Sequence, residues 1–223
     1  MIYEYKKKAD HFNIVKDNKL ILLANKKPFR VYSEKMANYI ILELKKNKFV
    51  DQVRTPITSL SFFASGLTNK DRIKIIKYLI KMIHFDNVLY STSVNKELKK
   101  MMNKNYKKYI LEFETFFSLK LKIIYNTLGM QTKLKTKRLL IFFKNLDNFS
   151  LSLFYKLVQH SKSVILSFFF ISKKFGITKF ENLCNLENNF QQRLWKITDE
   201  QKLINLEEKK KLKNYVIFFK LLN

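Results

Sequence analysis

Glycine and proline are scarce in this sequence, which has three glycines and two prolines among 223 residues. The glycines, Gly66, Gly129 and Gly176, are far apart, so they cannot form a glycine-rich phosphate-binding loop or a dinucleotide-binding turn. The same shortage disfavours a barrel or a sandwich, because these folds need many tight turns. The composition therefore predicts a mainly helical chain.

Cysteine and histidine are also rare. Cys184 is the single cysteine, which excludes an intrachain disulfide and a zinc site built from several cysteines. His11, His84 and His160 are far apart, and none has the helical spacing of a metal-binding pair. No serine lies in a nucleophile-elbow motif. These residues give no positive support for a catalytic or metal site. The alternative of an enzyme would need a polar pocket with convergent titratable groups.

Acidic residues are few, with 18 Asp and Glu against 44 Lys and Arg, so the formal net charge is +26. Only five of the 44 are arginine, which leaves 39 lysines. Lysine is abundant together with Asn, Ile, Phe and Tyr, whose codons are AT-rich, so drift in an AT-rich genome is one explanation of the charge. The alternative is a surface selected to bind a polyanion. We expect any binding of nucleic acid to be non-specific and sensitive to salt.

Long hydrophobic runs are absent. The longest strongly apolar stretch, residues 164–171, is much shorter than the ~20 residues that span a bilayer. Residues 1–10 lack the apolar core of a signal peptide and contain acids that a mitochondrial transit peptide avoids. We expect no transmembrane segment. A disordered chain is excluded because 47% of the residues are hydrophobic and 15% are aromatic.

The order of the expected elements predicts an α+β fold. Short apolar segments typical of strands occupy residues 12–15, 20–23 and 28–32, and residues 16–19 are typical of a hairpin turn. Ser33 is a good N-cap for a helix that extends to about Lys46. Apolar periodicity then predicts helices at about residues 69–83, 95–117, 134–146, 150–172, 179–195 and from 198 onwards. The expected organisation is a small mixed β-rich domain, residues 1–58, followed by a helical-bundle domain, residues 59–223.

Five segments resemble, in order, the motifs of one family. Residues 27–43 are similar to Lys-Pro-Leu-x-Leu-Pro-Ser-x-x-Leu-Ala-x-x-Ile-x-x-Glu, and residues 55–60 to Met-Pro-Leu-Thr-x-Leu. Residues 85–90 and 161–166 are similar to Thr-Asp-Leu-Leu-Cys-Tyr and Ser-Gly-Ser-x-Ile-Leu. Residues 186–195 resemble Leu-Glu-x-x-Tyr-Gln-x-x-x-Trp. These motifs are typical of the assembly chaperones of the ATP synthase catalytic head, the "ATP-twelve" family.

The chain also departs from the family pattern at several positions. Tyr32 replaces a proline, Leu44 a tryptophan, Ser91 an arginine and Lys196 the glycine that follows the tryptophan. The resemblance nevertheless covers nearly the whole chain, from about Lys8 to Glu200.

The resemblance implies a small mixed β domain followed by a helical bundle, without catalysis and without a cofactor. It also implies that the protein binds the unassembled ATP synthase α subunit and shields its β-facing interface until the catalytic head assembles. The expected location is the bacterial cytoplasm, or the mitochondrial matrix in a eukaryote, and the expected state is a monomer. An alternative of a different class is a lysine-rich RNA-associated protein, ribosomal or of ribosome assembly, which the charge of +26 favours.

Four residues of the last motif are candidates for contact with the partner: Glu187, Phe190, Gln191 and Trp195. On a helix, Glu187 and Gln191 are i, i+4 neighbours, and so are Gln191 and Trp195. One helix face would then present an acid, an amide and an indole. The alternative is that Trp195, the single tryptophan, packs inside the bundle and that Glu187 caps a neighbouring group. Pro56 and Thr58 are expected to form a turn between the two domains.

Overall fold

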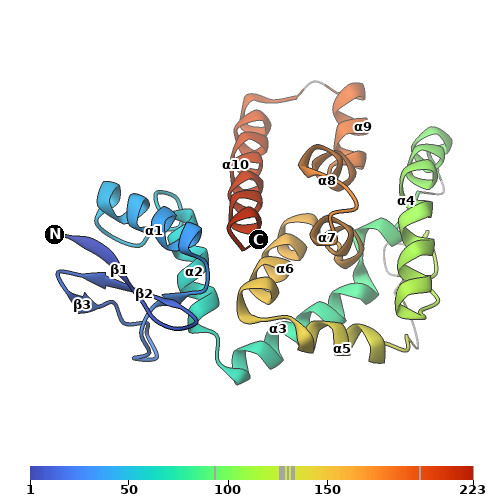
Figure 1. Ribbon diagram of the computed structural model, residues 1–223. Helices are drawn as coiled ribbons and strands as arrows, with labels where there is room; N and C mark the ends of the chain where they lie inside the picture. The colour runs from blue at the N-terminus through green and yellow to red at the C-terminus, as the bar shows by residue number, and fades with distance from the viewer. Residues whose placement is uncertain (93, 126–128, 130, 132–133, 196, 223) are drawn as a thin grey trace. The chain divides into compact units, whose positions relative to one another are not determined.

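The computed structural model describes residues 1–92, 94–125, 129, 131, 134–195 and 197–222 (Figure 1). The chain forms two compact units. The first consists of Met1–Ile73, Leu146–Leu153 and Lys211–Asn223, and the second of Lys74–Asn145 and Phe154–Lys210. A small antiparallel sheet at the N-terminus is followed by helices, so the predicted α+β fold class is confirmed.

The sheet lies in the first unit. Its strands are β1 (Tyr3–Lys7), β2 (Phe12–Lys16), β3 (Lys19–Leu20) and β4 (Arg30–Val31). β2 pairs with all three others, and each pairing is antiparallel. The predicted hairpin between β2 and β3 is confirmed, with Asp17 and Asn18 at φ of 47° and 64°. Such left-handed angles are tolerated best by Asn, Asp and Gly, which is why these two residues fit the tight turn.

Two helices, α1 and α2, follow the sheet in the first unit. α1 (Glu34–Asn47) begins at the predicted cap, where the Ser33 hydroxyl accepts a hydrogen bond of 3.4 Å from the Met36 N–H. α1 packs against β1, β2 and α2 (Pro56–Gly66). Pro56 occupies the first turn of α2, where its missing N–H needs no partner. Pro56 and Thr58 therefore belong to a helix, and the predicted turn between domains at these residues is wrong.

The second unit is helical. The elements that lie in it wholly or in part are α3 (Asn69–Met82), η1 (Ile83–Phe85), η2 (Asn87–Leu89), α4 (Lys96–Phe117), α5 (Lys137–Asn145), α6 (Asn148–Ser161), α7 (Val164–Ile171), α8 (Ile177–Cys184), α9 (Leu186–Leu194) and α10 (Asp199–Leu222). α3, α6 and α10 each begin in one unit and end in the other. Phenylalanine rings fill the core: Phe168 of α7 lies 5.5 Å from Phe113 and 5.1 Å from Phe117, measured between ring centroids. Such edge-to-face contacts add to the stabilisation from apolar burial.

Two helices are broken where the sequence predicts continuity. The predicted helix 150–172 is divided into α6 and α7, because Lys162 has a φ of 53° and Ser163 caps α7 through a 3.0 Å bond from the Leu166 N–H. The predicted helix 179–195 is divided into α8 and α9 at Asn185, whose φ and ψ are −103° and 17°. In both places a polar residue offers the chain an alternative to helical hydrogen bonding.

The two compact units differ from the domains predicted at 1–58 and 59–223. The first unit extends past α2 to Ile73 and also includes 146–153. Hydrogen bonds explain this: the Arg72 guanidinium donates to the Leu146 carbonyl at 2.7 Å, and the Asn148 amide donates to the Leu67 carbonyl at 3.2 Å. The first unit therefore combines segments that are far apart in the sequence. A division of the chain at a single position cannot describe it.

Candidate functional site

The candidate site is built on α8 and α9, which are fixed in the second unit by buried side chains. Phe180 and Leu183 of α8 and Phe190 of α9 are buried, and α9 packs against α4 and α8. Tyr106 of α4 donates a hydrogen bond of 2.8 Å from its hydroxyl to the Leu183 carbonyl. Lys209 of α10 lies 3.6 Å from the Glu181 carboxylate. The outer surface of α9 is therefore presented from a well-supported helix.

Glu187 and Gln191 lie on the solvent face of α9. The Gln191 amide donates a hydrogen bond of 3.3 Å to the Glu187 carboxylate, as the i, i+4 spacing predicts. Glu187 is in the first turn of α9, where the helix dipole favours a negative charge. Both side chains are exposed, so they are accessible to a partner.

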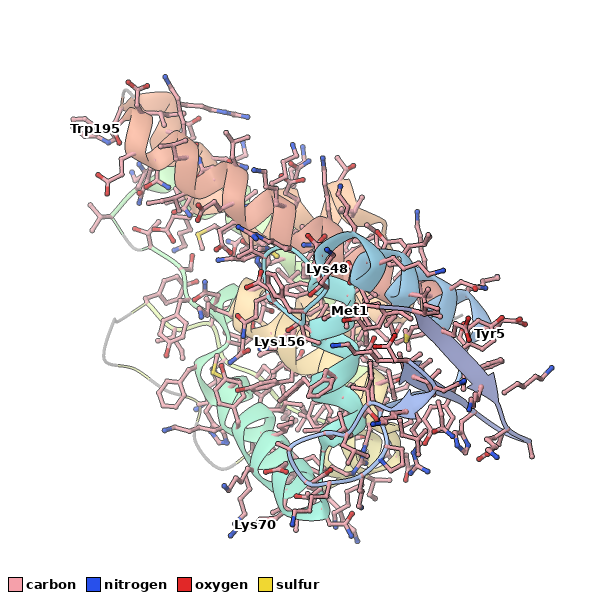
Figure 2. The ribbon with its side chains drawn as sticks, turned by 90° about the vertical axis from the view of Figure 1, so that its left-hand side faces the viewer. Met1, Tyr5, Lys48, Lys70, Lys156 and Trp195 are labelled. Carbon is pink, nitrogen blue, oxygen red and sulfur yellow. The ribbon has the colours of Figure 1, made fainter. Side chains whose placement is uncertain are left out.

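Trp195 ends α9 and is 74% exposed. Its backbone is extended, and its N–H donates a 3.0 Å hydrogen bond to the Gln191 carbonyl. Figure 2 shows the Trp195 side chain beside the first turns of α10. The alternative in which the indole packs inside the bundle is therefore wrong for this structure.

Phe190 has a different position from the other three candidates. Its ring is 6% exposed, so it faces the interior of the unit while Glu187, Gln191 and Trp195 face solvent. The structure therefore brings three of the four predicted residues to one surface. Phe190 holds α9 in place from the opposite face.

A hollow of about 290 Å³ lies where α9 meets the start of α10. It is lined by Asn188, Gln191, Gln192, Trp195, Ile197, Thr198 and Gln201. The lining combines amide groups with the indole, so it suits a side chain that has both an apolar and a hydrogen-bonding part. Thr198 caps the start of α10 beside the hollow, because its hydroxyl accepts a 3.2 Å hydrogen bond from the Gln201 N–H.

Two exposed apolar side chains, Trp195 and Ile197, line the hollow. Other exposed apolar side chains lie close to it in the sequence: Leu194, Leu203, Ile204 and Leu206. Large exposed apolar patches on soluble proteins mark interaction sites. We call the solvent face of α9 and residues 194–206, with 196 outside the described residues, the α9–α10 surface. The α10 part carries no motif in the sequence, since periodicity locates a helix but does not show which of its apolar side chains stay exposed.

The charge of this surface differs from that of the whole chain. Residues 186–206 contain three acids, Glu187, Asp199 and Glu200, and three basic residues, so this stretch is neutral, whereas the chain has a net charge of +26. The carboxylate of Asp199 lies 2.8 Å from the Lys202 ammonium. Because the chain as a whole is strongly basic, this neutral surface repels a basic partner less than the average surface of the protein does.

Groups that could support chemistry are dispersed. His84 lies 2.9 Å from the Gln131 carbonyl, and His160 lies 3.0 Å from the Glu208 carboxylate. Desolvation raises the pKa of the Cys184 thiol far above its usual value, and the Asp86 carboxylate adds to the effect, so this thiol is a poor nucleophile. Within the described ranges, no three His, Cys, Asp or Glu side chains gather as a metal ion would require.

A helix that spans a bilayer needs about 20 predominantly apolar residues. Over the residues that the structure describes, none is both long and apolar enough to cross a membrane.

Comparison with known proteins identifies the class of protein to which this fold belongs. Residues 2–114, just over half of the chain, match the model of the ATP12 chaperone protein family, so the chain belongs to that family. The segment that carries Glu187 and Trp195 lies outside the matched residues. No curated protein sequence gives a significant match.

Solved structures confirm the fold over the whole chain. Atp12 from Paracoccus denitrificans superimposes with a TM-score of 0.85 at 18% identity, covering 100% of this chain and 97% of that one. A variant of the same protein gives 0.84 at 17% identity, covering 100% and 96%. The Atu1473 protein from Agrobacterium tumefaciens gives 0.87 at 13% identity, covering 100% and 84%.

Proposed function

We propose that the protein is an assembly chaperone that binds the free ATP synthase α subunit through the α9–α10 surface. It shields the β-facing interface of that subunit until the catalytic head assembles. The observation that carries the proposal is an exposed apolar surface, centred on Trp195, in a member of the ATP12 chaperone family. The α9–α10 surface is thus assigned to α-subunit recognition.

The physical requirement for such a chaperone is clear. An unassembled subunit exposes apolar interface surface, which promotes aggregation at cellular concentrations. The chaperone must cover this surface and still be displaced by the β subunit. A surface of a few apolar side chains around an amide-lined hollow meets both needs, because it supplies contact area without a large hydrophobic interface.

Glu187 is proposed to orient the α subunit on the α9–α10 surface. Its carboxylate is fixed by Gln191 one helical turn away. A cation on the α subunit that pairs with this carboxylate would align the apolar side chains around Trp195 with their partner surface. Electrostatic complementarity of this kind favours the correct orientation more than it raises affinity.

The proposal includes no chemical step. The protein is proposed to act as a monomer, without a cofactor, in the compartment that contains newly made α subunit. This is the bacterial cytoplasm, or the mitochondrial matrix in a eukaryote.

The test is co-purification with the cognate α subunit, expressed with and without β. We expect a complex with free α that disappears when β is present, and suppression of α aggregation in stoichiometric mixtures measured by light scattering. The matched variant is Trp195→Ala, which should weaken both the complex with free α and the suppression of α aggregation. A folded protein that neither binds α nor suppresses its aggregation, or one that purifies with RNA in a complex stable at ~0.2 M salt, would contradict the proposal.

A further inference from the structure

A second exposed apolar surface lies in the first unit, in the loop between α1 and α2. We call residues 45–54 the basic loop. It presents Phe49, Val50 and Val53, which are 48%, 41% and 86% exposed. Leu42, one turn before the end of α1, is exposed as well. These apolar side chains face solvent next to a concentration of positive charge.

The basic loop contains Lys45, Lys46, Lys48 and Arg54, with Asp51 as its one acid. Lys45 and Lys46 follow Leu42 at i+3 and i+4, so all three lie on the solvent face of α1. Figure 2 labels Lys48 at the end of this helix. The loop thus carries four cations within ten residues, interleaved with exposed apolar side chains.

The loop is held in a defined shape by its own hydrogen bonds. The Asp51 carboxylate accepts bonds of 2.8 Å and 2.7 Å from the N–H groups of Val53 and Arg54. The Thr55 hydroxyl accepts a 2.7 Å bond from the Asp51 N–H. The Asn47 amide donates to the Arg54 carbonyl at 3.2 Å. The single acid of the loop is therefore engaged with the backbone, and Val53 is exposed at a fixed position.

A further contact fixes the start of the loop on the sheet. The Tyr3 hydroxyl donates a 2.7 Å hydrogen bond to the Lys48 carbonyl. Lys48 itself has a φ of 64° and ends α1. The exposed apolar side chains are therefore presented on a rigid base, so little conformational entropy is lost when they are buried.

We propose that the basic loop docks on an anionic phospholipid surface. Apolar side chains that project between lysines suit the boundary between headgroups and acyl chains, where the cations pair with lipid phosphates and the apolar groups insert. Charge distinguishes this loop, which has four basic residues and one acid, from residues 186–206, where three acids and three basic residues balance. The loop would hold the protein at the membrane on which an ATP synthase head must finally be placed, a step that goes beyond binding of the α subunit.

The composition of the loop favours a lipid over a nucleic acid. Its exposed apolar groups include two valines, which cannot stack on bases, and its one exposed ring, Phe49, lies under the Arg54 guanidinium at 5.8 Å. Three of its four cations are lysines, which bind phosphate as point charges without reading bases.

The experiment is co-sedimentation of the full chain with vesicles at ~0.1 M salt. Vesicles of phosphatidylcholine alone are compared with vesicles that contain about 30% phosphatidylglycerol, whose headgroup is anionic. We expect binding to the anionic vesicles and little to the neutral ones. Absence of binding to anionic vesicles overturns the proposal.

Two triple variants distinguish vesicle binding by the basic loop from vesicle binding by the overall charge of the chain. Lys45→Gln, Lys46→Gln and Lys48→Gln together should weaken binding about a hundredfold, because each lysine near the surface contributes about fivefold. Phe49→Ser, Val50→Ser and Val53→Ser together should weaken it about tenfold or more, since the inserted apolar area is lost. Thermal melting of each variant checks that the fold is kept.

The matched control removes the same charge elsewhere in the first unit. Lys6→Gln, Lys7→Gln and Lys8→Gln change three exposed lysines at the far end of β1, and vesicle binding should stay within about threefold of the original. If the control loses as much binding as the lysine loop variant, the net charge of the chain is responsible and the proposal is wrong. Vesicle binding retained by the serine variant likewise overturns it.

A local probe reports insertion directly. In a Trp195→Phe chain, Val53→Trp places the single indole on the loop, and anionic vesicles should shift its emission to shorter wavelength. If the indole emission is unchanged while the chain sediments with the vesicles, another surface binds them. Loss of α-subunit protection by the loop variants, without any vesicle binding, would assign the loop to a protein partner instead.

Discussion

The Glu43 carboxylate accepts two hydrogen bonds from Thr58, one from its main-chain N–H and one from its hydroxyl, each 2.7 Å long. It also accepts a 3.2 Å bond from the Ile57 N–H. A side chain of α1 therefore caps the N-terminus of α2, in the place that a local capping residue would normally occupy. The negative charge at this helix end is further favoured by the helix dipole.

Glu43→Ala should therefore destabilise the protein by about 2–3 kcal/mol, because hydrogen bonds to a charged group are lost and the N–H groups of Ile57 and Thr58 have no replacement partner. Urea unfolding measures the change. Glu207→Ala, at an exposed position of α10, should change stability by less than about 0.5 kcal/mol. Similar losses for the two variants would show that the cap contributes little.

Helix boundaries with a local signal could be predicted from the sequence. Ser33 before α1 and Asn95 before α4 are capping residues with hydrophobic periodicity behind them, and both predicted starts are confirmed within one residue. The break at Lys162 and Ser163 was missed. Ser163 is a local capping signal there as well, but apolar residues continue on both sides of it, and the bond from the Ile165 N–H to the Asp86 carboxylate, 79 residues earlier, is long-range.

Asp86 is fully buried and joins two of the family-like segments. Its carboxylate accepts hydrogen bonds from the N–H groups of Val88, at 3.2 Å, and Ile165, at 3.0 Å. Burial raises the pKa of this carboxyl to about 6, although the hydrogen bonds partly oppose the shift. The native state therefore holds a proton more tightly than the unfolded chain does.

The stability of the protein relative to its Asp86→Asn variant should fall as the pH rises from about 4 to about 6. The proton is lost from the native state only near pH 6, while the unfolded carboxyl ionises near 3.8, so the stabilisation present at low pH disappears across this window. The difference in unfolding free energy should change by about 3 kcal/mol. Urea unfolding at several pH values measures it, and a flat or rising difference would contradict the prediction.

The site could be predicted only in part. The motif of residues 186–195 predicts four candidates, Glu187, Phe190, Gln191 and Trp195, and the hydrogen bond between Gln191 and Glu187 confirms the helical spacing of that pair. Trp195 lies beyond the last helical residue, so helical spacing does not determine its direction. The α10 half of the surface has no sequence signal, because Leu203, Ile204 and Leu206 would normally be assigned to a buried face.

Truncation to alanine should affect different properties at Phe190 and Trp195: the stability of the protein at Phe190, and protection of the α subunit at Trp195. Phe190→Ala removes a buried ring and should lower the unfolding free energy by about 3 kcal/mol or more. Trp195→Ala removes an exposed one and should change it by less than about 0.5 kcal/mol, while weakening protection of the α subunit. Chemical unfolding and light scattering of α mixtures give the two readouts. A large loss of stability in Trp195→Ala would place the indole in the core.

The lysines outside the basic loop are expected to be products of drift. Of the 44 basic residues 39 are lysine, and Lys108, whose ammonium lies 3.8 Å from the Glu112 carboxylate, is exposed. Exposed pairs of this kind contribute little to stability. Replacing about ten scattered lysines with glutamine, leaving residues 45–48 intact, should keep α-subunit protection within about threefold. Loss of protection at ordinary salt would show that the overall charge is part of α recognition.

Glu187→Gln tests the proposed surface most directly. The substitution keeps the size and helix propensity of the side chain and removes only its charge. Since Glu187 is exposed, helicity and melting should not change. A charged hydrogen bond that is desolvated at an interface is worth about 1.5–3 kcal/mol, so affinity for the α subunit should fall about tenfold to a hundredfold.

Glu4→Gln is the matched control for this substitution, because Glu4 is an exposed acid on the sheet of the first unit. It should protect the α subunit as well as the original chain does. The decisive measurement is the concentration of each variant that halves α aggregation, read together with its melting temperature. If Glu187→Gln melts many degrees lower and still protects at low temperature, the carboxylate supports α9 through Gln191 and does not contact the α subunit. If Glu4→Gln loses protection equally, the effect belongs to the net charge of the chain, and the assignment of the α9–α10 surface fails.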